Sequence, residues 1–127
     1  MNEKGEKGRI AEDIALGFLI DEGLVLLDRN WRWGHRELDL LMYSRNGLGG
    51  EPLLHVVEVR SLSEPSTKMP FETVDRKKQL SVIRAAQGYV MMHRINFETR
   101  FDVVSVSFKK DGGHELEYFP DAFTPEW

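Results

Sequence analysis

Two apolar segments with β-strand character, joined by a glycine-rich stretch, constrain the fold of this chain more than any other feature. Residues 37–43 read ELDLLMY and residues 53–60 read LLHVVEVR, and segment 44–52, SRNGLGGEP, holds three glycines and a proline between them. β-Branched and aromatic residues favour strands, whereas glycine and proline mark turns. These segments therefore predict an antiparallel hairpin with residues 44–52 as its loop.

The hairpin would bring two acidic side chains together, because alternate residues of a strand point to the same face. Closing the loop with Tyr43 opposite Leu54 places Asp39 opposite Glu58, with their Cβ atoms about 5 Å apart. Arg60 lies two residues beyond Glu58 and points to the same side. The same alternation predicts that one face is shared by Leu38, Leu40 and Met42.

The acidic pair suggests a site for a divalent cation. Two carboxylates at this separation repel each other unless a cation or a proton lies between them. Proteins commonly hold Mg²⁺ with one or two carboxylates plus water and substrate phosphate, so Asp39 and Glu58 are candidate ligands. Arg60 is a candidate to bind a phosphate and to stabilise developing charge. In the alternative interpretation these are ordinary polar positions at a strand end, and Asp39 forms a salt bridge with Arg60.

The remaining periodicity predicts an α/β domain with a mixed sheet and helices packed on it. A first helix is expected over residues 7–23, with Gly23 as its C-cap. A second is expected from about Glu72 to about His93. The expected apolar stripes consist of Ile10, Ala11, Ile14, Ala15 and Phe18 in the first helix and Leu80, Ile83, Ala86 and Val90 in the second. Strands are expected at 24–33, 37–43, 53–60, 100–108 and 115–119, in the order α-β-β-β-α-β-β. We expect residues 1–127 to form one domain, with a flexible N-terminus over residues 1–6.

Two charged residues on the predicted helices allow both a structural and a functional interpretation. Glu12 lies at the edge of the apolar arc of the first helix. It either faces the acidic hairpin or is a solvated charge favoured near a helix start. Lys77 either leans toward the sheet and contacts a phosphate, or belongs to a solvated basic turn.

The aromatic pair Trp31 and Trp33 alternates with Arg32 in a predicted strand. This pattern either stacks bases and holds a nucleic-acid backbone or packs into the core, and core packing is favoured. The four histidines show no metal-ligand spacing, and His55 is expected to be a hydrogen-bonded core residue.

Composition excludes several classes of protein. The chain has no cysteine, and no run of about 18 apolar residues that would span a membrane. The polar N-terminus does not resemble a signal peptide, and we expect a cytoplasmic protein. The net charge is −4, which argues against coating of nucleic acid by charge alone. Residues 60–100 nevertheless carry eight basic and four acidic side chains. Serine-hydrolase, P-loop and dinucleotide-binding motifs are absent.

Six short segments in a fixed order resemble the YraN-type bacterial proteins, which are predicted endonucleases. They are KGRIAED at 7–13, LLDRNWR at 26–32, RELDLL at 36–41, VVEVRS at 56–61, PFETVDRKK at 70–78 and RFDVVSV at 100–106. The resemblance covers residues 5 to 123. It implies a restriction-endonuclease-like three-layer core of the PD-(D/E)XK superfamily, related to archaeal Holliday-junction resolvases.

The resemblance also implies roles for particular residues. Asp39, Glu58 and the Val59 carbonyl would bind Mg²⁺ or Mn²⁺, and Glu12 would join the site. Glu37 matches an acid two positions before the ligand aspartate. Arg60 stands where the broader superfamily prefers lysine, and arginine is not deprotonated in proteins.

These observations favour a Mg²⁺-dependent endodeoxyribonuclease that acts on phosphodiester bonds, branched DNA among its substrates. Its catalytic residues would be Glu12, Asp39, Glu58 and Arg60, with support from Glu37 and Lys77. The expected DNA contacts are Arg32, Arg60, Lys77 and Lys78, and two-fold DNA would favour a homodimer. One alternative is a non-catalytic nucleic-acid- or partner-binding module on the same fold. Another is a structural domain whose acids form a salt-bridge network.

Overall fold

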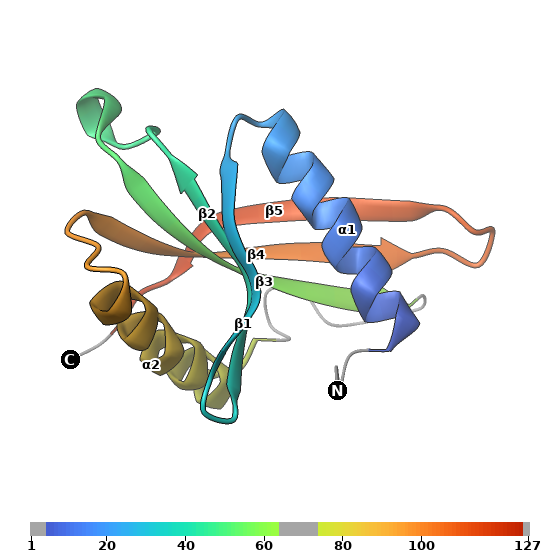
Figure 1. The fold of residues 1–127 in the computed structure, drawn as a ribbon. Coiled ribbons are helices and arrows are strands. Elements are labelled where there is room, and N and C mark those ends of the chain that lie inside the picture. The colour runs from blue at the N-terminus through green and yellow to red at the C-terminus, as the bar shows by residue number, and fades with distance from the viewer. Residues whose placement is uncertain (1–4, 64–73, 126–127) are drawn as a thin grey trace.

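A five-stranded mixed sheet with one helix on each face forms the core of the structure (Figure 1). The computed structural model describes residues 5–63 and 74–125. In chain order the elements are α1 (Glu6–Asp21), β1 (Val25–Trp33), β2 (Arg36–Ser44), the 3-10 turn η1 (Leu48–Gly50), β3 (Leu53–Ser63), α2 (Arg76–Met92), β4 (Glu98–Phe108) and β5 (His114–Phe123). The strands lie in the order β1-β2-β3-β4-β5. β3 and β4 run parallel, with α2 as their crossover, and the other neighbours are antiparallel. The predicted α/β fold and element order are confirmed.

Some predicted boundaries were wrong. The flexible N-terminus was expected over residues 1–6. Residues 1–4 lie outside the described residues, but Gly5 is the N-cap of α1 and Glu6 is already helical. β3 extends through Ser63, three residues beyond the end expected at Arg60, and residues 64–73 lie outside the described part. The expected start of the second helix at Glu72 also lies outside it. α2 begins only at Arg76, after the N-cap Asp75.

The end of α1 follows from a single glycine, as predicted. Gly23 has a φ of +96°, a conformation that glycine adopts without steric cost. Its N–H donates to the Ile20 carbonyl, and the Leu24 N–H donates to the Leu19 carbonyl. This pair of bonds is a Schellman motif, in which apolar residues on either side of the cap pack together. Leu19 and Leu24 are both buried in the core under α1, so the cap directs the chain from α1 into β1.

The hairpin of β2 and β3 has the predicted register. Tyr43 lies opposite Leu54, and the regular pairing continues to Leu40 opposite Val57. The regular pairing ends one step before Asp39 and Glu58, and the Asp39 carboxylate there accepts from the Val59 N–H. The local pattern of apolar residues and turn residues was therefore sufficient to align these two strands.

Strict alternation along β2 was nevertheless wrong at one point. Leu38 packs with Leu41 in the core under α2, whereas Leu40 and Met42 pack in the core under α1. The change of face falls at Asp39. On the neighbouring strand the residue level with Asp39 is Asn30, which has a φ of +53°. Asparagine tolerates this left-handed conformation better than most residues, and the irregular backbone there accompanies the exchange of faces.

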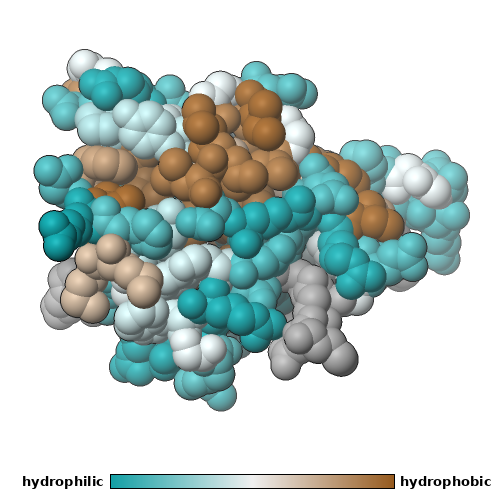
Figure 2. Space-filling model, in the orientation of Figure 1, coloured by the Kyte–Doolittle hydropathy of each residue, from teal (hydrophilic) through white to brown (hydrophobic). Residues whose placement is uncertain are grey.

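The edge strand β1 exposes apolar side chains. Its pairing with β2 shifts between Leu26 and Asp28, so an extra residue, Leu27, interrupts the alternation. Val25, Leu26 and Leu27 are all exposed, as is Ile20 in the last turns of α1. Figure 2 shows apolar surface gathered over this part of the molecule. No helix in the described ranges is long and apolar enough to cross a membrane.

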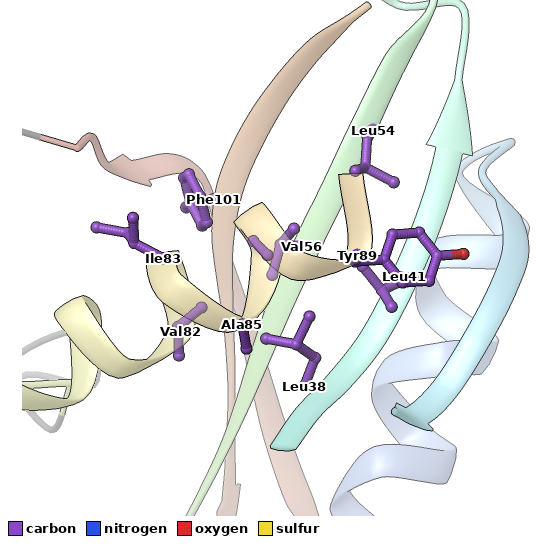
Figure 3. Packing of buried hydrophobic residues seen from close by; sticks show 10 residues of the cluster. Leu38, Leu41, Leu54, Val56, Val82, Ile83, Ala85, Tyr89 and Phe101 are labelled. Carbon is purple, nitrogen blue, oxygen red and sulfur yellow. The ribbon is translucent and has the colours of Figure 1, made fainter. Parts of the chain in front are cut away.

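The sheet separates two apolar cores, one under each helix. Figure 3 shows the core under α2, where Val82, Ala85 and Tyr89 meet strand residues such as Leu38 and Val56. The predicted stripe of α2 was right in part: Ile83 and Ala86 are buried and Val90 packs against this core, but Leu80 is exposed. The other buried residues of α2 are Val82, Ala85, Gly88 and Tyr89. In α1 the buried line consists of Ala11, Glu12, Ala15 and Leu19. Ile10 is exposed, and Ile14 and Phe18 are only partly buried.

The two tryptophans of β1 pack against α2, as favoured from the sequence. Their rings stack at 5.8 Å between centroids, and Trp31 meets Tyr89 edge-to-face. Trp33 lies against Gly88, where an added Cβ would approach its ring to 2.6 Å. Gly88 therefore allows the β1 edge to approach the helix.

Candidate functional site

A polar pocket of about 380 Å³ lies where the starts of both helices meet the second half of β3. Its lining includes Glu12 from α1, Asp39 from β2, and Glu58 from β3. These three acids have relative exposures of 1%, 7% and 1%. Buried carboxylates are costly unless they are paired or bind a cation. The pocket therefore concentrates charge that the fold must compensate.

Asp39 replaces a strand-to-strand hydrogen bond with one from its own side chain. Its Oδ2 accepts from the Val59 N–H at 2.9 Å. This contact lies just beyond the last regular β2–β3 pair, Leu40 with Val57. The Asp39 carboxylate is thereby held beside Glu58, and Val59 also lines the pocket.

Glu58 is buried among weakly compensating groups. Burial raises its pKa to about 8, the nearby Asp39 charge contributes to the rise, and Lys78 acts in the opposite direction. The Lys78 Nζ lies 3.5 Å from Glu58 Oε1. The other oxygen, Oε2, is buried and has no hydrogen-bond partner among residues 5–63 and 74–125. Glu58 thus offers an oxygen with spare acceptor capacity to a ligand of the pocket.

The cation from α2 is Lys78 and not Lys77. The Asp75 side chain caps the helix by accepting from the Lys78 N–H at 2.8 Å, which places Lys78 at the third helical position. From there Lys78 lies one turn before the buried Val82 and faces the sheet. Lys77 is exposed and does not line the pocket. Lys77 was expected to lean toward the sheet because it lies one turn before Leu80, but Leu80 is exposed.

Glu12 is tied to β1 by an arginine that the sequence did not single out. Arg29 Nε lies 3.4 Å from Glu12 Oε1, and its Nη2 contacts Asp13 at 2.6 Å. One guanidinium therefore joins two consecutive acids of α1 to the strand. Glu12, which lines the pocket, is thereby connected to β1.

Some sequence-derived candidates meet here and others do not. Arg60 and Lys78 line the pocket together with Glu12, Asp39 and Glu58. Glu37 and Arg32 instead form an ion pair at 3.1 Å across the β1–β2 hairpin and do not line it. Within residues 5–63 and 74–125, no three His, Cys, Asp or Glu side chains converge closely enough to hold a metal ion by themselves. Any metal here would depend on two carboxylates, a backbone carbonyl and water.

A second buried polar network joins four strands away from this pocket. His55 Nδ1 lies 2.8 Å from Asp102 Oδ2, and its Nε2 lies 2.7 Å from Ser44 Oγ. Tyr118 OH donates to Asp102 Oδ2, and the Asp121 N–H donates to Oδ1. Burial, followed by the Asp102 charge, holds the pKa of Tyr118 well above its ordinary value. The prediction that His55 is a hydrogen-bonded core residue is confirmed.

The fold and pocket define an α/β protein with a buried acid pair at the end of a hairpin and cations around it. Residues 11–106 match the model of an uncharacterised protein family, UPF0102. A UPF0102 protein of Bacteroides thetaiotaomicron is 33% identical over 98% of both chains. One of Parabacteroides distasonis is 35% identical over 97% of this chain and 96% of its own. One of Syntrophotalea carbinolica is 38% identical over 91% and 89%. The chain belongs to the UPF0102 family, and the resemblance to the YraN-type proteins is confirmed.

Proposed function

We propose that this protein is a metal-dependent endonuclease that cleaves DNA phosphodiester bonds. The observation that carries the proposal is the pairing of buried Asp39 and Glu58 in one pocket with the cations Arg60 and Lys78. Phosphodiester hydrolysis needs negative ligands for a metal ion and positive groups for the phosphate. In a purely structural ion-pair network, both oxygens of a buried carboxylate are expected to have partners. Glu58 Oε2 has none among the described residues.

The donor set fits a hard divalent cation. Asp39 and Glu58 supply carboxylate oxygens, Glu58 Oε2 is free to accept, and the Val59 carbonyl is a candidate third oxygen. Mg²⁺ favours such oxygen ligands and usually keeps several waters. When bound, Mg²⁺ or Mn²⁺ would lower the pKa of water and offset charge on the phosphate.

The chain's own cations would bind and orient the substrate. Arg60 can hold two phosphate oxygens through its planar guanidinium, but it does not exchange protons. Lys78, whose Nζ lies 3.5 Å from Glu58 Oε1, would offset negative charge on the bound phosphate. Glu12, held by Arg29, would orient water on the opposite wall.

Cleavage assays test this assignment. We expect Asp39→Asn and Glu58→Gln to reduce cleavage of branched and linear DNA at least ~100-fold in Mg²⁺ or Mn²⁺. Glu117→Gln is the control, since Glu117 is an exposed acid on β5. Equal cleavage by all four proteins would assign the activity to a contaminant and refute the proposal.

A second candidate is a DNA- or partner-binding module without catalysis. Arg60 favours it, because the motif position that usually carries lysine here carries a group that cannot transfer protons. Salt-dependent DNA binding without cleavage, and without Mn²⁺ binding by calorimetry, would support this module. Within the nuclease proposal, a cytoplasmic homodimer is expected, because two-fold branched DNA presents two equivalent strands. Sedimentation of the protein with and without such DNA tests that part.

A further inference from the structure

A second pocket, of about 480 Å³, lies beside the start of α1 and the tip of the β4–β5 hairpin. Figure 1 shows this hairpin projecting beyond the sheet on the side where α1 begins. The pocket combines apolar side chains with basic ones, among them Ile10, Ile14, Phe108, Lys7, Lys109 and Lys110. In Figure 2 apolar surface borders the hydrophilic hairpin at this end. We call it the hairpin pocket.

Lys7 joins the hairpin pocket to the acidic pocket, because it lines both. Its Nζ donates to Ser63 Oγ at the end of β3 and lies 5.8 Å from the centre of the Phe108 ring. Ser61 lines the acidic pocket and Ser63 the hairpin pocket. The end of β3 therefore runs from one pocket to the other, with Lys7 as the shared wall.

The chemistry of the hairpin pocket matches a nucleic-acid backbone. Lysine ammonium groups bind phosphates, and apolar or aromatic side chains accept sugars and bases. Lys109 is paired with Glu115 at 2.7 Å, so its charge is partly compensated, whereas Lys110 is exposed at the hairpin tip. Among the described residues, the lining of this pocket contains no acidic side chain. It therefore differs in charge from the acidic pocket beside it.

We propose that the hairpin pocket binds the phosphate backbone of the DNA strand beyond the scissile bond. This inference rests on the proposed function, because it takes the acidic pocket as the point of cleavage. Glu58 and Ser63 are five residues apart along β3, which at about 3.3 Å per residue is roughly 16 Å. The hairpin pocket would thus contact the DNA backbone roughly 16 Å from the cleaved phosphate.

Fluorescence anisotropy with labelled duplexes tests the proposal independently of cleavage. The comparison uses the wild-type protein, its Lys109→Ser/Lys110→Ser double variant, and an Arg45→Ser control. Arg45 is an exposed cation in the loop that joins β2 to β3, at the end of this hairpin away from Glu58. Each lost phosphate contact should lower the slope of log affinity against log salt by about 0.9. We therefore expect a decrease of one to two in the double variant and none in the control. Mn²⁺ binding by calorimetry should be unchanged in both.

The outcomes separate this inference from the nuclease assignment. If the double variant has the wild-type affinity and salt slope while Asp39→Asn abolishes cleavage, the hairpin pocket is not a DNA site and the nuclease proposal stands. If the double variant loses affinity and slope but the wild-type protein cleaves nothing, the binding site stands and the nuclease proposal fails. Binding of polyglutamate, but not DNA, that depends on Lys109 and Lys110 would assign the pocket to an acidic protein partner and overturn the inference.

Discussion

The buried Glu58 carboxyl should make the stability of this protein fall as pH rises, and Glu58→Gln should remove that effect. Burial and the Asp39 charge raise the pKa of Glu58 to about 8 from an ordinary 4.5. Between these values the folded protein keeps a proton that the unfolded chain has lost. The folded state binds more protons, so the free energy of unfolding decreases with pH across this window. Glutamine keeps the shape of the protonated acid and has no charge to lose.

The magnitude follows from the same two values. At about 1.4 kcal/mol per pKa unit, the difference between 4.5 and about 8 is worth roughly 5 kcal/mol as an upper limit. Structural relaxation and water entry reduce such penalties, so we expect ~2–4 kcal/mol. Glu58→Gln and wild type should differ little near pH 5. Above about pH 8 the variant should be more stable by this amount.

Urea unfolding followed by tryptophan fluorescence measures the difference, with EDTA present to remove divalent ions. Trp31 and Trp33 report on packing between β1 and α2. The exposed Glu117→Gln variant is the matched control and should follow the wild-type pH profile. A stability difference between Glu58→Gln and wild type that stays constant from pH 5 to 9 would refute the argument. It would show that Glu58 is ionised in the folded protein throughout.

Three further perturbations test other contacts. Lys78→Met removes the cation that lowers the Glu58 pKa, so the pH-dependent loss of stability should move to higher pH in the same urea assay. An unchanged midpoint pH for this loss would show that Lys78 does not affect the ionisation of Glu58. Gly88→Ala should lower the free energy of unfolding by ~1–3 kcal/mol, because the clash with Trp33 at 2.6 Å outweighs the ~1 kcal/mol gain in helix propensity. A variant that is more stable in urea would mean that β1 moves away from α2 at little cost. Asp102→Asn should cost ~2–4 kcal/mol in thermal unfolding, since His55, Tyr118 and the Asp121 N–H share this carboxylate; a cost within the error of measurement would show that water replaces these bonds.

The hairpin of β2 and β3 shows what the local sequence pattern could and could not predict. Its register followed from alternation and one loop, since both strands are adjacent in sequence and the loop closes them directly. Alternation failed at Asp39, where the Asp39 side chain takes the Val59 N–H and Asn30 distorts the neighbouring strand. An irregularity that involves contacts with neighbouring strands cannot be recognised from the alternation of apolar and polar residues within β2. For that reason Leu38 was assigned to the wrong face.

The lysine at the site shows where helix periodicity becomes ambiguous. Residues 80, 82, 83, 85, 86, 89 and 90 of α2 are apolar or aromatic, so two stripes offset by a residue or more are both consistent with its sequence. The structure selects the stripe of Val82 and Tyr89, because Tyr89 reaches the Asp28 carboxylate and Gly88 receives Trp33. The cation directed at Glu58 is consequently Lys78.

The sequence by itself determined the order of elements, the acidic hairpin and the cap at Gly23, because each depends on residues close together in the chain. Only the tertiary structure decided which cations meet the acids. Arg29 reaches Glu12 across 17 positions, and Lys78 reaches Glu58 across 20. Such contacts depend on the crossing angle and rotation of packed helices, which are set by the shapes of the side chains between them. The hairpin pocket likewise exists only because the end of β3, the start of α1 and the β4–β5 hairpin meet in space.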